Sequence, residues 1–148
     1  MISAKDIQKL RIETGFGIME CKKALSDSNG DFEKAKKKLS KEGAAKAEKR
    51  KDRKTQFGVV EAYIHDGKMG SIVVLGCETD FVAKNDQFKN LAHDIAMQIT
   101  SMDPQNIKEL LSQPYIKDND MTIDELIKNN IGKIGENIQI VDFKRFGL

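Results

Sequence analysis

The side chains best suited to catalysis or metal binding are few in this sequence and lie far apart. Two cysteines, Cys21 and Cys77, and two histidines, His65 and His93, form neither a Cys-x-x-Cys pair nor a His-Glu-x-x-His cluster. Two lysines next to Cys21 could lower its thiol pKa, but no histidine is near it in sequence to act as a base. No P-loop, G-x-G-x-x-G or EF-hand spacing occurs. We therefore expect no enzyme, no metal site and no cofactor, and a reducing compartment.

One connection combines polar and apolar residues in an unusual order. It is the segment 77–86, CETDFVAKND, between a predicted strand and a predicted helix. Thr79 and Asp80 directly precede Phe81 and Val82. Phe81 could fold back onto the core, or it could be exposed as an aromatic anchor of the kind that dominates many protein interfaces. The residue pattern leaves both interpretations open.

The elements that would position this connection fall into two differently charged parts. Residues 1–54 carry 16 Lys and Arg against 9 Asp and Glu, a net charge of +7, whereas residues 55–148 carry 9 against 14, a net charge of −5. The basic stretch Lys34–Lys54 could contact phosphates, but acidic residues interrupt it and no aromatic side chain is available for stacking. A solvated linker is therefore favoured over a nucleic-acid contact.

The first part is predicted to be three short amphipathic helices. Ser3 and Asp6 form a capping pattern for the first helix, and the glycines of 14–17 end it. The third helix should end at Gly43, a plausible C-cap. We expect residues 1–43 to form a helical module and residues 44–55 to form a basic, exposed linker.

The second part, residues 56–148, is predicted to be an α+β domain. Alternation of apolar residues and turn signals predict strands, helices and a final strand in the order 57–65, 71–78, a helix from Asp86, a short helix from Asp103-Pro104, a helix capped by Thr122, and a strand over 136–143. Such an order favours a three-stranded antiparallel sheet packed with helices.

The predicted strands are apolar on both faces, and the helices suffice to cover one. Ile72 and Val74, together with one face of the last strand, would be left without cover. Two interpretations compete: a second copy of the chain packs on this face in a homodimer, or the segment 101–121 folds over it. We expect the homodimer, because covering a sheet usually takes a whole layer of structure.

Length and hydropathy exclude other classes. The 148 residues correspond to about one domain. No stretch approaches the ~18 apolar residues of a membrane-spanning helix. Residues 1–6 lack the apolar run of a signal peptide. We therefore expect a cytoplasmic protein without a membrane partner.

Three motifs resemble the bacterial-type elongation factor Ts family. Residues 10–25, LRIETGFGIMECKKAL, are similar to its first signature; residues 79–84, TDFVAK, to its second; and residues 134–138, IGENI, to a third. They occur in the family's order and span nearly the whole chain. The resemblance implies a ubiquitin-associated-like three-helix module, a linker and an α+β core. It also implies nucleotide exchange on elongation factor Tu.

The resemblance also implies roles for individual residues. Thr79, Asp80, Phe81 and Val82 match the segment that dislodges Mg²⁺ from the partner's nucleotide site, with Phe81 as the intruding side chain. The N-terminal contact surface corresponds to Arg11, Ile18 and Met19, where Ile18 replaces the methionine of many relatives. A further contact corresponds to Ile134 and Gly135. The partner would be elongation factor Tu, in its GDP-bound and nucleotide-free forms.

The chain departs from the family pattern in being short. Longer relatives have a second core half and a helical hairpin, and we expect this chain to lack them because it stops at Leu148. Two functions from other classes compete with nucleotide exchange: a nucleic-acid-binding module that uses the basic half, and a scaffold that carries a ubiquitin-associated-like domain.

Overall fold

The computed structural model describes residues 1–148, and its first three helices form a small bundle. They are α1 (Ala4–Thr14), α2 (Ile18–Asp27) and α3 (Phe32–Arg50). As predicted, Ser3 and Asp6 cap α1 reciprocally: the Asp6 amide donates to Ser3 Oγ at 3.1 Å, and the Ser3 amide donates to Asp6 Oδ2 at 3.0 Å. Seven buried residues form the bundle core: Leu10, Phe16, Cys21, Ala24, Leu25, Ala35 and Leu39.

The third helix does not end at Gly43, so that prediction is wrong. Helix α3 continues to Arg50, and Gly43 lies buried within it against α7 (Ile123–Ile134). The two backbones approach so closely that a Cβ added at Gly132 would lie 2.5 Å from the Gly43 Cα. Ala47, one turn further along, is buried in the main core. The second half of α3 therefore packs through Gly43 and Ala47, while most of its other residues are exposed. The division into domains at 1–43, 44–55 and 56–148 stays a prediction.

Replacing Gly132 by alanine is expected to lower the free energy of unfolding by about 1 kcal/mol. Helix propensity alone would favour alanine by about 1 kcal/mol. The new methyl group would overlap Gly43, however, and overpacking typically costs about 1–3 kcal/mol. Urea-induced unfolding measures the change. A gain in unfolding free energy would mean that α3 and α7 separate without penalty.

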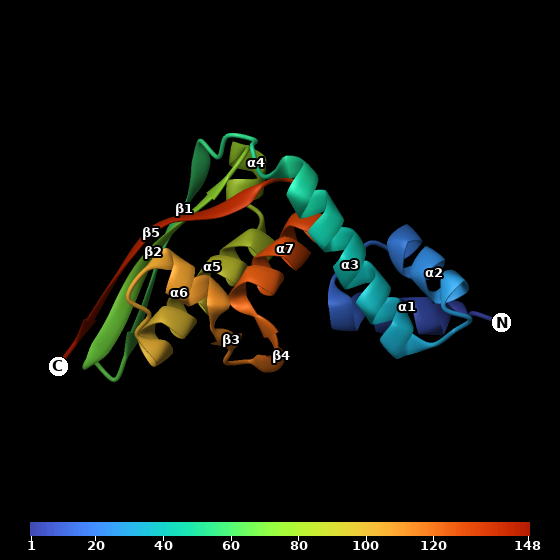
Figure 1. Cartoon of the computed structure of the whole chain (residues 1–148), viewed down its shortest axis with the longest axis horizontal. Coiled ribbons are helices and arrows are strands. Elements are labelled where there is room, and N and C mark those ends of the chain that lie inside the picture. Colours follow the sequence, from blue (N-terminus) through green and yellow to red (C-terminus); the bar gives the residue numbers. More distant parts are fainter.

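The remaining residues form a three-stranded sheet with helices on one side, which confirms the α+β prediction (Figure 1). The strand order is β1 (Phe57–His65), β2 (Met69–Cys77) and β5 (Ile138–Gly147), and both neighbouring pairs are antiparallel. Helix α5 (Asp86–Met102) packs on β1 and β2, and α7 packs beside it. The main core lies between these helices and the sheet. None of the helices has both the length and the apolar character needed to cross a membrane.

The segment between α5 and α7 differs from the prediction. Asp103 ends α5 in a left-handed conformation, with φ of 47°. The next helix, α6 (Ile107–Ser112), therefore begins only after its cap residue Asn106. A two-stranded hairpin of β3 (Pro114–Tyr115) and β4 (Asp118–Thr122) follows, which the sequence pattern did not indicate. As predicted, the Thr122 hydroxyl caps α7 by accepting the Glu125 amide at 3.2 Å.

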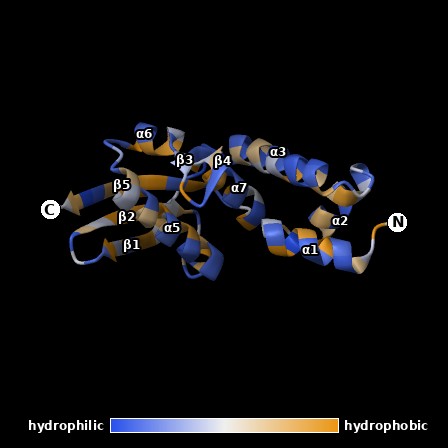
Figure 2. Cartoon of the chain, turned by 90° about the horizontal axis from the view of Figure 1, so that it is seen from below, coloured by the Kyte–Doolittle hydropathy of each residue, from blue (hydrophilic) through white to orange (hydrophobic).

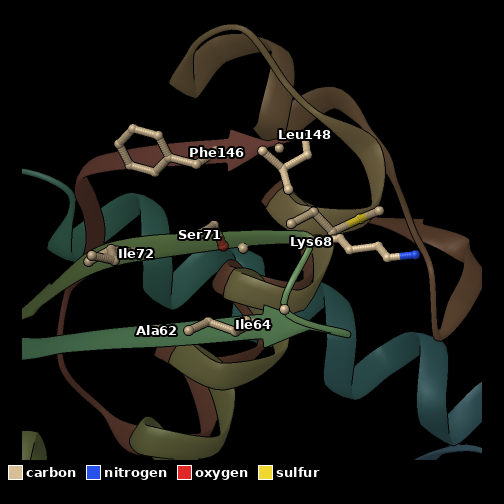
Figure 3. Close-up of a pocket in the computed structure, with 11 residues that line it drawn as sticks. Ala62, Ile64, Lys68, Ser71, Ile72, Phe146 and Leu148 are labelled. Carbon is tan, nitrogen blue, oxygen red and sulfur yellow. The ribbon is translucent and has the colours of Figure 1, made fainter.

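The outer face of the sheet carries no helix (Figures 1 and 2). The segment that could have covered it, 101–121, lies on the inner side, because its Leu110 and Tyr115 are buried in the main core. A pocket of about 500 Å³ opens at one end of the outer face, where Ile64, Ile72 and Phe146 lie around it (Figure 3). The apolar outer face predicted from the strand pattern is thus present and uncovered within one chain.

Candidate functional site

The Thr79–Val82 segment forms the start of a very short helix at the end of β2. Helix α4 spans Asp80–Ala83, and the Thr79 hydroxyl caps it by accepting the Val82 amide at 3.3 Å. Ala83 is buried and Val82 packs against the main core. Phe81, which directly precedes them, is 89% exposed. Phe81 therefore does not fold back onto the core.

Asp80 lies in the first turn of α4, where a carboxylate interacts favourably with the helix dipole. Its Oδ2 is 2.9 Å from the Lys84 ammonium, one turn later. Both side chains are more than half exposed, so this pair contributes little to stability. Asp80 and Phe81 are both accessible to a partner.

The third motif packs directly against this segment. Helix α7 ends at Gly135, which adopts a left-handed φ of 87°, and Ile134 precedes it, half-buried. The next residue, Glu136, accepts hydrogen bonds from the amide groups of Glu78 and Thr79 at 3.1 and 3.0 Å. The structure therefore brings Ile134 and Gly135 next to the Thr79–Val82 segment, although they are more than 50 residues apart in the chain.

A second set of hydrogen bonds joins these two segments to the residues that follow α3. The Asn137 amide donates to Glu78 Oε2 at 2.8 Å, and its side-chain amide donates to the Arg53 carbonyl at 2.8 Å. The Arg53 guanidinium lies 3.7 Å from Glu78 Oε1. The segments noted in the sequence include Glu78, Glu136 and Asn137, but the sequence did not indicate that they contact one another, because residues so far apart in sequence give no local signal.

The N-terminal candidates form a separate exposed surface. Arg11, Ile18 and Met19 are all exposed, at 52% for Ile18 and 72% for Met19. Figure 1 shows α1 and α2 along one end of α3 and α4 beside the other. A helix of 19 residues spans about 28 Å at 1.5 Å per residue. The structure therefore does not bring Arg11, Ile18 and Met19 to Phe81; it holds the two surfaces apart on one helix.

The residues considered for catalysis or metal binding do not converge, and of the four only Cys77 lies near Thr79. Burial raises the pKa of the thiols of Cys21 and Cys77, the opposite of an activated nucleophile. His65 Nδ1 lies 2.9 Å from the Tyr63 hydroxyl, and His93 lies 3.6 Å from Glu61. No group of three or more His, Cys, Asp or Glu side chains is arranged to hold a metal ion.

Comparison with known proteins connects this arrangement to one family. The family model described as Elongation factor TS matches residues 78–147, which include α4 and the Glu136 contacts. The chloroplastic elongation factor Ts of Rhodomonas salina is 42% identical over 194 aligned positions, covering 99% of this chain and 89% of that protein. Elongation factor Ts of Coprothermobacter proteolyticus is 39% identical over 193 positions, covering 99% of this chain and 98% of that protein.

The length difference from these two relatives is internal. Their alignments run over 194 and 193 positions although this chain has 148 residues, so at least 45 positions face gaps in this chain. The prediction that the departure lies at the end is therefore wrong for both. Elongation factor Ts of a Nostoc species is 47% identical over 148 positions, covering 99% of this chain and 47% of that protein. With such identity over nearly the whole chain, and over most of two relatives, this protein belongs to the elongation factor Ts family.

Proposed function

We propose that this protein promotes the release of GDP from elongation factor Tu, within the translation elongation role that the family indicates. The observation that carries the proposal is Phe81, an aromatic side chain that is 89% exposed although the next two residues, Val82 and Ala83, pack on the core. Exposed aromatic anchors often supply a disproportionate share of binding energy. We infer that Phe81, with Thr79, Asp80 and Val82, intrudes near the partner's nucleotide site.

The mechanism needs no covalent step and no enzyme chemistry in this chain. A GTPase holds GDP through its phosphate loop and Mg²⁺. A side chain that displaces these groups lowers the affinity of the GTPase for GDP. By reciprocity, bound GDP lowers the affinity of the GTPase for the exchange factor by the same factor. The protein must therefore bind nucleotide-free elongation factor Tu more tightly than the GDP-bound form, because equal affinity for both would shift nothing. Asp80, next to Phe81, adds negative charge where Mg²⁺ would otherwise be held.

Two further contacts complete the proposed interface. Ile134 and Gly135 lie beside the Thr79–Val82 segment and would touch the same domain of the partner. Arg11, Ile18 and Met19 would form the second contact at the other end of α3. Because α3 packs closely on α7, the distance between the two contacts is set before binding.

The direct test measures release of a fluorescent GDP analogue from elongation factor Tu with excess unlabelled GDP. The expected result is a release rate that rises with the concentration of this protein and then saturates. Equal release with and without the protein would reject the proposal. The dissociation constants of this protein for GDP-bound and for nucleotide-free elongation factor Tu should differ by the same factor by which this protein lowers the affinity for GDP.

The N-terminal contact predicts that replacing Ile18 and Met19 together by alanine weakens binding to elongation factor Tu about tenfold. Both side chains are exposed, so the free energy of unfolding should change by less than about 0.5 kcal/mol. Truncating an interface hot spot costs about 2 kcal/mol or more and most other contacts cost less than about 1 kcal/mol, and a loss of about 1.4 kcal/mol for the pair corresponds to tenfold. Calorimetric titration gives the affinity, with Met102→Ala as the control, an exposed methionine at the end of α5. An unchanged affinity would exclude this surface from the interface.

These point variants are preferable to deletion of residues 1–54. The deletion would remove Ala47 from the main core and Gly43 from its contact with α7. A loss of binding would then report damage to the core as well as loss of the contact.

The nucleic-acid alternative has one observation behind it. A groove between α3 and α7 contains Lys37, Lys41 and Lys128. Lys128, however, is paired with Asp124 at 2.8 Å, and Glu125 also lines the groove. RNA binding with a steep dependence on salt, together with no effect on GDP release, would favour this alternative over nucleotide exchange.

A further inference from the structure

Helix α4 is too short to hold its own conformation. It has four residues, whereas isolated helices shorter than about 12 residues are marginal even in favourable sequences. Phe81 makes no contribution through its own packing, because its side chain is exposed. The direction in which Phe81 is presented must therefore be set by contacts of the residues around it.

Glu136 supplies the largest group of such contacts. One carboxylate oxygen accepts the amide groups of Glu78 and Thr79 at 3.1 and 3.0 Å. The other accepts the Thr79 hydroxyl at 2.7 Å. Hydrogen bonds to an ionised acceptor are roughly twice as strong as neutral ones. A single carboxylate thus holds the backbone and the side chain of the residue that begins α4.

The Thr79 hydroxyl passes this constraint on to α4. It donates to Glu136, so its lone pairs remain free to accept the Val82 amide at 3.3 Å, which is the cap of α4. Because the Thr79 hydroxyl donates to the carboxylate and accepts the Val82 amide at the same time, both hydrogen bonds require the same rotamer of Thr79. The Cys77 thiol also donates to the Thr79 carbonyl at 3.2 Å. Phe81 lies within the turn that this cap fixes.

We propose that Glu136 is a positioning residue for nucleotide exchange: it holds Thr79 so that α4 presents Phe81 in the orientation that fits the partner. This inference rests on the proposed function. Without the carboxylate, the segment samples other conformations, and the apparent affinity falls in proportion to the competent fraction. Glu136 itself need not touch elongation factor Tu.

The test compares Glu136→Ala and Glu136→Gln with the control Glu109→Ala, an exposed glutamate on α6. Glu136→Ala is expected to lower kcat/KM for GDP release about tenfold, mainly by raising KM. Glu136→Gln keeps an acceptor for the two amides, and its kcat/KM for GDP release should fall about threefold. Glu109→Ala should match the original protein. Equal activity of all variants would overturn the inference.

Two further measurements separate positioning from general stability. Amide hydrogen exchange of Glu78 and Thr79 should accelerate about tenfold in Glu136→Ala, with the amides of α5 unchanged. In a background that already carries Phe81→Ala, Glu136→Ala should cause no further loss of exchange activity, because a residue that acts only through Phe81 is non-additive with it. An additive loss, or unchanged amide exchange, would contradict the positioning role.

The two proposals can fail separately. If the original protein does not accelerate GDP release, the proposed function and the role of Glu136 in it both fall. The amide exchange would then still show whether Glu136 holds the segment. If the original protein is active and only the Glu136 variants behave like the control, the positioning role alone is rejected.

Discussion

Replacing Phe81 by alanine is expected to lower the rate of GDP release from elongation factor Tu about 30-fold while the fold stays intact. The side chain is 89% exposed, and surface truncations usually change stability by less than about 0.5 kcal/mol. An aromatic hot spot contributes about 2 kcal/mol or more to a complex. That free energy corresponds to about 30-fold in an equilibrium constant. The measurements are nucleotide release under limiting concentrations of the variant, and urea-induced unfolding.

Phe88→Ala provides the contrast. Phe88 is fully buried in the first turns of α5, and truncating a buried phenylalanine costs about 3–5 kcal/mol. The two variants should therefore differ: Phe81→Ala lowers the rate of GDP release without lowering the free energy of unfolding, whereas Phe88→Ala lowers the free energy of unfolding. A loss of several kcal/mol in Phe81→Ala would show that the side chain is a core residue in solution. Normal exchange activity would show that it is not the intruding side chain.

Much of the fold follows from local patterns in the sequence. The Ser3–Asp6 and Thr122–Glu125 caps, the alternation of β1 and β2, and the helical spacing of α5 are each determined within a few residues, and the structure has all of them. The predictions that failed concern residues with distant partners. Glycine is the residue type that often ends a helix, which is why the sequence pattern predicts a C-cap at Gly43. In the structure Gly43 contacts Gly132, and glycine is favoured there because a side chain would not fit between the two helices.

The candidate site shows the same limit. Phe81 stands out because an aromatic residue follows polar ones in a connection, but only the structure shows that its side chain points away from the core. In the sequence Glu136 is only one residue of the third motif, and the structure places its carboxylate next to Thr79. Hydrogen bonds between residues 57 positions apart depend on the register of β2 and β5, which no local pattern specifies.

The protein is expected to form a homodimer through the outer face of its sheet. This face presents Val60 and Ile64 of β1, Ile72 of β2 and Phe146 of β5, which are between 45% and 72% exposed. Three strands about 4.8 Å apart and about 30 Å long make a face of roughly 400 Å². The apolar part of this face is comparable to the largest apolar patch of a typical monomer, about 300–600 Å², and such patches are often functional.

A second copy of the chain is the occupant that fits this face. No segment of the same chain is placed to cover it, because 101–121 packs on the inner side. On this face β5 carries one charge of each sign, Asp142 and Lys144, next to Val74 and Ile72 of β2. A two-fold axis brings the same patch of two copies together, so that each acidic side chain can lie opposite the basic one of the other copy.

Sedimentation equilibrium at micromolar concentration should therefore give about twice the chain mass of 16.6 kDa. Replacing Ile64 and Ile72 together by lysine should return the protein to the mass of one chain, since like charges and desolvation would oppose the apolar contact. Circular dichroism should stay unchanged, because both side chains point away from the core of their own chain (Figure 3). Ile18→Lys, at an exposed position in the N-terminal bundle, is the control and should leave the dimer intact. A single species of 16.6 kDa at all concentrations of the original protein would contradict the dimer and leave the apolar face to a different partner.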